Sequence, residues 1–436
     1  MSQDEPVDPL ADIDSVDWAA VAHAYGPATD IPDALRRLQQ ADDVQDAYWV
    51  LYGNLYHQGT RYAATATAIP FLYRLLDDPH TPQKELLLEY LTKLAIGANS
   101  TQSPMGQAEA GWLETVRAMQ SDPAYVDRLR QTQATWLNAS TSQADRQKRE
   151  RELQLQPKPE GAVEVAMMNH RAYAAVQAGV DSLIARLQDP AAVVRAHAAY
   201  TMAWFPAVQP QTRPALEALL ATEPDVAVRA SALFSLAITQ YMTGDLAADS
   251  AVARLLQAEA AAPDADLFVR WVGCLGLLKL RCQTADQLAL VARKLTDDAF
   301  LNEYESENLE ERGTVFPFAA HDIEDLAALA TLETAGLKGS EHPEFARAIM
   351  QTFASASGLE LLSLTASCIN IAFDGVTPPR GAPFHTFTPL QQELLHALLN
   401  VSDSMWAFAN FTMIMDQWTL PGSKPELEKL VRSSCT

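Results

Sequence analysis

Apolar residues recur three and four positions apart along most of the chain, which is the spacing of α-helices that bury one face. In the first part of the chain this pattern predicts helices over residues 31–40, 42–56, 61–76 and 82–96. The pattern weakens between residues 97 and 160 and is strong again from Val163 to Leu187. The chain is therefore predicted to be helical, with one irregular stretch in its first half.

From about residue 189 to residue 278, one pattern occurs three times. In each copy an acid lies six positions before an arginine, a small residue three positions after it, and a large apolar residue seven positions after it. The acid–arginine pairs are Asp189 and Arg195, Glu223 and Arg229, and Asp264 and Arg270. The arginines are 34 and 41 residues apart, and such a period without a strand signal is typical of stacked helical hairpins. The sequence thus predicts an all-α fold, a right-handed α-solenoid of stacked helical hairpins.

Each repeated acid lies beside a proline. We expect the proline in the first turn of a helix, where its missing N–H costs nothing, and the acid near the positive end of the helix dipole. The small residue lets a neighbouring helix approach closely. The arginines are expected to form a ladder along the stack, in which each one meets acids of its own and the adjacent unit.

The pattern Asp/Glu-Pro-x-x-x-Val-Arg-x-x-Ala resembles HEAT repeats of the armadillo-type superhelix, in particular the short repeats named after phycobilisome lyases. It covers about 90 residues directly. Four further stretches are similar to uncharacterised bacterial HEAT-repeat proteins, and these are His23–Gly26, His57–Tyr62, Ala203–Pro206 and Trp406–Asn410. The resemblance implies an interaction scaffold and brings little information on an activity.

The remaining sequence divides around these repeats. The predicted segments are a disordered acidic N-terminus (1–14), N-terminal helical repeats (15–97), an irregular helical insertion with a run of mixed charge (98–162), the regular repeats (163–282), and degenerate C-terminal repeats with a cap (283–436). The run of mixed charge, residues 145–152, is expected to be a solvated helix face or a mobile loop. The alternative is a basic interaction patch, which the interleaved acids weaken.

The net charge of the chain indicates which classes of partner it can bind. The formal net charge is −23, so the chain is poorly suited to neutralise the phosphates of nucleic acid or of an anionic membrane surface. A basic protein or peptide is the favoured partner. The acidic N-terminus has no apolar run typical of a signal peptide, and the four cysteines form no CxxC pair, so we expect a cytoplasmic protein with reduced thiols.

Two turns are candidate binding sites. The first contains His57, Gln58, Thr60, Arg61 and Tyr62 around Gly59, and its side chains suit an anion or a peptide group. The structural alternative is that Thr60 caps the next helix, Arg61 pairs with an acid, and His57 bonds a backbone carbonyl.

The second is the long loop 373–389, in which Arg380 and His385 lie among prolines and aromatic residues. Its structural alternative is a loop packed over the end of the solenoid. Thr388 and Gln391 at the end of this loop predict a capping box.

The sequence contains no convincing catalytic or metal-binding motif. His321-Asp322-Ile323-Glu324-Asp325 and Glu341-His342 bring histidine and carboxylates near each other, but the helical His pairings of zinc sites are absent from the sequence. We expect neither a metal, a cofactor nor a catalytic residue.

The sequence therefore favours a non-catalytic HEAT-repeat scaffold or adaptor for protein–protein interaction. The alternative is an enzyme or small-molecule-binding protein, lyase-like, with a site near the His57–Tyr62 turn. An open acidic or aromatic groove favours the scaffold, and a closed pocket around His57, Arg61 and Tyr62 favours the alternative.

Overall fold

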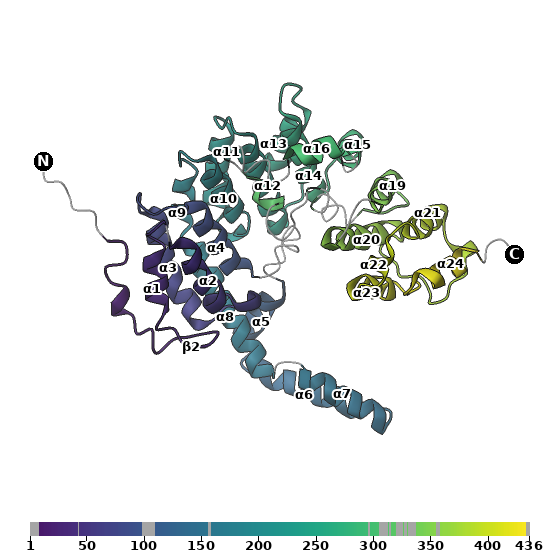
Figure 1. The fold of residues 1–436 in the computed structure, drawn as a ribbon, viewed down its shortest axis with the longest axis horizontal. Coiled ribbons are helices and arrows are strands. Elements are labelled where there is room, and N and C mark those ends of the chain that lie inside the picture. The colour runs from purple at the N-terminus through teal and green to yellow at the C-terminus, as the bar shows by residue number, and fades with distance from the viewer. Residues whose placement is uncertain are drawn as a thin grey trace, which may run out of the picture. The chain divides into compact units, whose positions relative to one another are not determined.

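Helices dominate the computed structural model, as the sequence predicts, and the described strands are one short antiparallel pair (Figure 1). The pair joins β1 (Ala22–His23) to β2 (Gly26–Pro27). The structure describes residues 8–41, 43–97, 110–155, 158–294, 297–304, 313, 315–319, 326, 329, 337–354 and 358–432. The chain forms two compact units, Met1–Gln188 and Asp189–Thr436, and each is described by itself.

The N-terminal unit is built around one long helix, α8, which packs against α3, α4 and α5 (Figure 1). Its helices are α1 (Ile31–Arg37), α2 (Val44–Leu55), α3 (Ala63–Asp77), α4 (Lys84–Ile96), α5 (Ala110–Ser121), α6 (Tyr125–Asn138), α7 (Gln143–Leu155), α8 (Pro159–Ala178) and α9 (Val180–Arg186), with a 3₁₀ turn, η2, at His57–Gly59. The buried hydroxyl of Tyr73 in α3 donates to the carbonyl of Val176 in α8 (2.6 Å). This hydrogen bond links α3 to the C-terminal end of α8.

The expectation of a disordered N-terminus is wrong for residues 8–14, while residues 1–7 lie outside the described part. Leu10 and Ile13 are buried, and Ile13–Ser15 forms a 3₁₀ turn, η1. Asp12 pairs with Arg74 of α3. Residues 8–14 are therefore ordered despite their acidic composition. The burial of Leu10 and Ile13 and the ion pair of Asp12 offset the conformational entropy that this segment loses.

The predicted insertion begins with residues 98–109, which lie outside the described part of the chain. After α5 the chain forms the pair α6 and α7, which pack on each other with mostly exposed side chains. The run of mixed charge lies in α7, where Arg146 pairs with Glu150 and Arg149 with Asp145 one turn away. The run is a solvated helix face, one of the two outcomes that the sequence predicts.

The C-terminal unit begins with the regular repeats. Its elements are α10 (Ala192–Met202), η4 (Pro206–Val208), α11 (Gln209–Leu220), α12 (Val226–Thr243), α13 (Ala251–Ala261), α14 (Leu267–Lys279), α15 (Ala285–Lys294), α16 (Asp298–Tyr304), η5 (Pro317–Ala319), α19 (Pro343–Thr352), α20 (Gly358–Ala372), η6 (Phe384–Thr386), α21 (Pro389–Leu398), α22 (Asp403–Trp406), α23 (Ala409–Gln417) and α24 (Lys424–Arg432). Helices α10, α12 and α14 pack side by side, and α11 and α13 form hairpins with α12 and α14. This is the stacked-hairpin arrangement that the repeat period predicts.

Small residues bring the stacked helices close together. A Cβ atom on Gly273 would lie 3.3 Å from the backbone nitrogen of Ala260, and the hydroxyl of Ser235 donates to the carbonyl of Ala199 in the adjacent repeat (2.7 Å). A later segment of the chain, η5, covers part of α10 and α12. Its Phe318 packs edge-on against Tyr200 of α10 (4.8 Å between ring centroids) and Phe234 of α12 (4.9 Å). The face of the repeats around Tyr200 and Phe234 is therefore buried in the core.

The expected helix starts need a correction. Pro190 and Pro224 precede their helices and do not occupy the first turn. Asp225 caps α12 by accepting from the Val228 N–H (2.9 Å), and Asp266 caps α14 by accepting from the Phe268 N–H (2.8 Å). In the second and third copies the acid two residues after the repeated one makes the better cap, because it occupies the position immediately before the first helical residue.

The repeated arginines do bridge neighbouring hairpins. Arg195 donates through Nε and Nη2 to both carboxylate oxygens of Glu223 in the next repeat (2.7 and 2.8 Å). Arg229 pairs through Nη2 with Glu259 of α13 (2.8 Å). The third copy differs, because Arg270 donates to the carbonyl of Ala260 (3.4 Å) and Asp264 is exposed.

The end of the C-terminal unit contains one confirmed and one wrong prediction. Thr388 and Gln391 form the capping box of α21. Residues 403–418, expected as one helix, divide into α22 and α23 at Phe408, whose backbone is extended. Trp406 and Phe411 are both buried and pack against each other (4.9 Å between ring centroids), which a continuous helix would prevent, since positions five apart face different sides.

Candidate functional site

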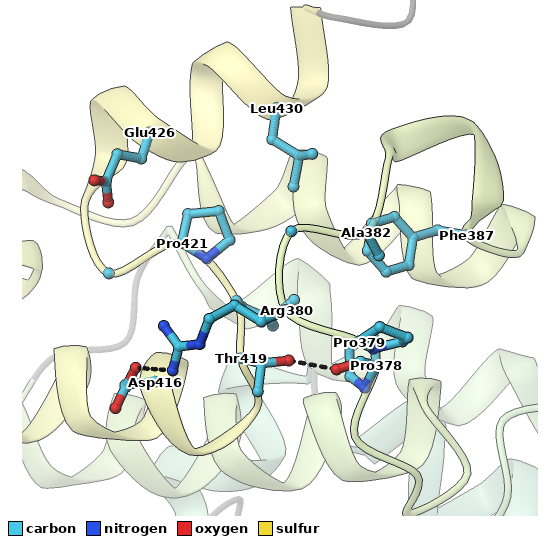
Figure 2. A pocket seen from close by; sticks show the side chains of 13 residues that line it. Pro378, Pro379, Arg380, Ala382, Phe387, Asp416, Thr419, Pro421, Glu426 and Leu430 are labelled. Carbon is cyan, nitrogen blue, oxygen red and sulfur yellow. Dashed lines mark hydrogen bonds and ion pairs between the residues drawn. The ribbon is translucent and has the colours of Figure 1, made fainter.

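A pocket of about 440 Å³ opens in the C-terminal unit, between the loop that contains Arg380 and the segment that leads from α23 into α24 (Figure 2). Its lining residues are Pro378, Pro379, Arg380, Gly381, Ala382, Phe387, Asp416, Thr419, Leu420, Pro421, Gly422, Glu426 and Leu430. The hydroxyl of Thr419 donates to the carbonyl of Pro378 and ties the two walls together. The predicted loop thus forms one wall of a pocket, whereas the structural alternative was a loop packed over the end of the solenoid.

The pocket has apolar side chains in its wall and charged groups at its rim. Phe387 and Leu420 are buried side chains in its wall, and Leu430 contributes from α24. On one rim, Arg380 Nη2 donates to Asp416 (2.7 Å), and both side chains are about 70% exposed. Glu426 stands on another part of the rim (Figure 2). The lining residues include two carboxylates and one guanidinium, so the rim carries net negative charge.

Three prolines stiffen the walls of the pocket. Pro378 and Pro379 hold the loop, and Pro421 holds the segment opposite (Figure 2). The fixed φ angle of proline reduces the freedom that a binding loop loses when a ligand is bound. The cavity is therefore suited to receive one apolar side chain without a large ordering cost.

The structure does not bring the second residue predicted for this site into the pocket. His385 lies exposed in η6, whereas Arg380 lines the cavity. Asp416, Thr419 and Glu426 are polar lining residues that sequence reasoning missed. Nothing in their local sequence marks them, because they reach the loop around Arg380 only through the packing of the fold.

The turn between α2 and α3 differs from its predicted structure. Thr60 does not cap α3, because the helix begins at Ala63 with Tyr62 at the N-cap position. Thr65 Oγ1 accepts from the Tyr62 N–H (2.9 Å) and donates to the carbonyl of Leu55 (2.7 Å). Gln58, at φ 49°, is a non-glycine residue in a left-handed conformation, which is a strained backbone state.

The side chains of this turn point to different environments. His57 Nδ1 lies 3.2 Å from the hydroxyl of Tyr25, a residue that is 69% exposed, and not on the expected backbone carbonyl. Burial raises the pKa of Tyr62, which lies near Tyr25. Arg61 is buried beneath the turn, and Nη1 donates to the carbonyl of Gly59 (2.7 Å). The expected ion pair of Arg61 with an acid is absent among the described residues.

Metal-ligand and nucleophile chemistry find no support in the described part of the chain. The stretch His321–Asp325 lies outside it, and His342 Nδ1 is 3.5 Å from Glu344. Within the described residues, histidine, cysteine and carboxylate side chains form no cluster of three that suits a metal ion. Burial raises the pKa of Cys274 to about 11, so this thiol is protonated and unreactive at neutral pH.

The N-terminal aromatic residues divide between core and surface. Tyr48, Tyr52 and Tyr90 pack together, with Tyr52 and Tyr90 at 4.7 Å between ring centroids. Trp49 on the same helix is 82% exposed. Core packing therefore explains the positions of these three tyrosines, whereas Trp49 faces solvent.

The paired and stacked helices define an α-helical repeat protein. A family model described as HEAT repeats matches residues 153–237, so the chain contains HEAT repeats. The match includes α8 to α11 and most of α12, and it does not distinguish the phycobilisome-lyase kind from other HEAT repeats. No curated protein and no solved structure matched the chain. Among the helices that the structure describes, none has both the length and the apolar composition that crossing a bilayer requires.

Proposed function

We propose that this protein is a non-catalytic scaffold that binds a basic partner protein. The HEAT repeats carry this proposal, because such repeats commonly serve as protein-interaction scaffolds. The net charge of −23 supports a basic partner, since complementary charge speeds association and disfavours acidic competitors. The inner face of the regular repeats near Tyr200 is filled by η5, so the docking site is expected elsewhere.

The pocket beside Arg380 is the proposed docking site. Its apolar wall suits one aliphatic or aromatic side chain of the partner, and Asp416 and Glu426 suit an adjacent lysine or arginine. The ligand is therefore a peptide segment in which a large apolar residue neighbours a basic one. Such a segment would be anchored by the apolar side chain and selected by the charge on the rim.

Selection of random peptides displayed on phage against the full-length protein tests this proposal. The selected peptides should share a large apolar residue next to lysine or arginine. Their affinity should fall about tenfold or more in Glu426→Lys, because this change replaces attraction by repulsion at the rim.

Glu428→Lys is the matched control for this experiment. Glu428 lies in the same helix, pairs with Arg432 (3.1 Å), and does not line the pocket. The control variant should bind the selected peptides within about twofold of wild type. Selected peptides without a basic residue, or equal losses in the two variants, would refute the proposed docking site.

A further inference from the structure

The turn between α2 and α3 leaves half of a buried guanidinium group without hydrogen bonds. Arg61 is 3% exposed, and its Nη1 donates to the carbonyl of Gly59 (2.7 Å). Its Nε and Nη2 atoms are buried and have no hydrogen-bond partner. No ion pair among the described residues includes Arg61. The unmatched atoms are therefore the two donors on one edge of the guanidinium.

Two other arginines of this protein show what this edge binds. Arg195 holds both oxygens of Glu223 through Nε and Nη2 (2.7 and 2.8 Å), while its Nη1 donates to the carbonyl of Asp189 (2.9 Å). Arg347 holds Glu393 through the same two atoms (2.7 and 3.0 Å). Arg61 matches Arg195 in the backbone contact of Nη1 and lacks only the carboxylate.

The guanidinium of Arg61 is held in place from two sides. Gly59 accepts from it, and a Cβ atom on Gly97 would lie 2.2 Å from Nη1, so only glycine leaves room for it there. Gly97 ends α4, and the partial negative charge of that helix end is favourable for a cation. It supplies no acceptor to Nε or Nη2, whose burial without partners is costly.

Arg61 is charged at neutral pH. Burial lowers the pKa of Arg61 to about 10, and the guanidinium therefore keeps its proton at pH 7. A buried cation with an unmatched two-donor edge is complementary to a planar anion with two oxygens.

We propose that Arg61 is the receptor for a small carboxylate ligand, whose two oxygens accept from Nε and Nη2. Because this edge is buried, the ligand is small. This site lies in the N-terminal unit and is independent of the proposed peptide pocket.

The test uses the full-length protein with acetate, the smallest suitable carboxylate with a methyl group, and sodium chloride at equal ionic strength as reference. Acetate up to about 100 mM is needed, because small fragments bind weakly. The ¹⁵Nε–H signal of Arg61, assigned by its loss in Arg61→Lys, should move saturably with acetate. The melting temperature of wild type should rise by about 3 °C at roughly 100 times the Kd.

Arg61→Met and Arg61→Lys provide the controls. Arg61→Met removes the charge without breaking an ion pair, so it should fold and show no acetate-specific rise in melting temperature. Arg61→Lys keeps the positive charge but loses the pair of N–H donors that bind both carboxylate oxygens. Its rise in melting temperature with acetate should be at least several-fold smaller than that of wild type.

An unmoved Arg61 signal up to the highest acetate concentration would overturn the proposal. So would a response to inorganic phosphate but not to acetate, which would make the ligand a tetrahedral anion. A rise in melting temperature that is equal in wild type and Arg61→Met would place acetate elsewhere. If neither variant folds, the ¹⁵Nε–H signal is assigned in the wild type from its through-bond correlations to the Arg61 backbone, and it still decides, because it reports directly on the guanidinium.

Discussion

Glu223→Ala should destabilise the C-terminal unit strongly, because it leaves Arg195 without its partner. The Glu223 side chain is 2% exposed and that of Arg195 is 15% exposed. Glu223 also accepts from the N–H of Asp225 (2.9 Å), the residue that caps α12. Breaking a buried pair costs about 3–5 kcal/mol, and we expect a loss of about 3–4 kcal/mol because Arg195 keeps some contact with water.

The chain contains a matched control for this prediction. Arg347 and Glu393 form the same bidentate pair, but their side chains are 48% and 43% exposed. Glu393→Ala should therefore cost only about 0–1 kcal/mol. Urea unfolding of the full-length variants gives the free energies, and hydrogen exchange of peptides from α12 and α21 assigns each loss to its region. Equal costs for the two variants would refute the argument that burial sets the value of the pair.

Two further predictions follow from packing and ionisation. A Cβ atom on Gly179 would lie 2.2 Å from the ring of Tyr73, which is buried, so Gly179→Ala should cost about 1–3 kcal/mol in urea unfolding. Gly53→Ala in α2 meets nothing within 4 Å and should stabilise the protein by up to about 1 kcal/mol, and an equal loss in both variants would contradict this reasoning. Burial raises the pKa of Cys274 to about 11, so only about one thiol in a thousand is ionised at pH 8, and mass spectrometry should find it alkylated more slowly than the half-buried Cys282. Faster alkylation of Cys274 in the folded protein would be inconsistent with its burial.

The sequence predicts the helical repeats well, because local spacing determines them. The apolar and small residues around Arg195, Arg229 and Arg270 lie on stacked helices, as their periodicity indicates. The ends of these helices are less predictable. Two acids stand near the starts of α12 and α14, and only the packing decides that Asp225 caps α12 while Glu223 pairs with Arg195.

The candidate sites depend on contacts that spacing does not encode. The peptide pocket needs Glu426 of α24 to approach the loop around Arg380, and these residues are far apart in the sequence. Arg61 has an ordinary sequence context, and its buried guanidinium lies close to Gly97 at the end of α4, which is far from it in the sequence. The sequence therefore identifies the turn and the loop as candidates but not the groups that complete them.

A substitution that fills the pocket is the sharpest test of whether a basic peptide docks there. Ala382 lines the pocket, and Ala407 is an exposed residue between α22 and α23 that does not. Fluorescence anisotropy with a selected peptide should show at least about tenfold weaker binding to Ala382→Trp and unchanged binding to Ala407→Trp, at equal stability of both variants. Equal affinity of the two variants for the peptide would contradict the account.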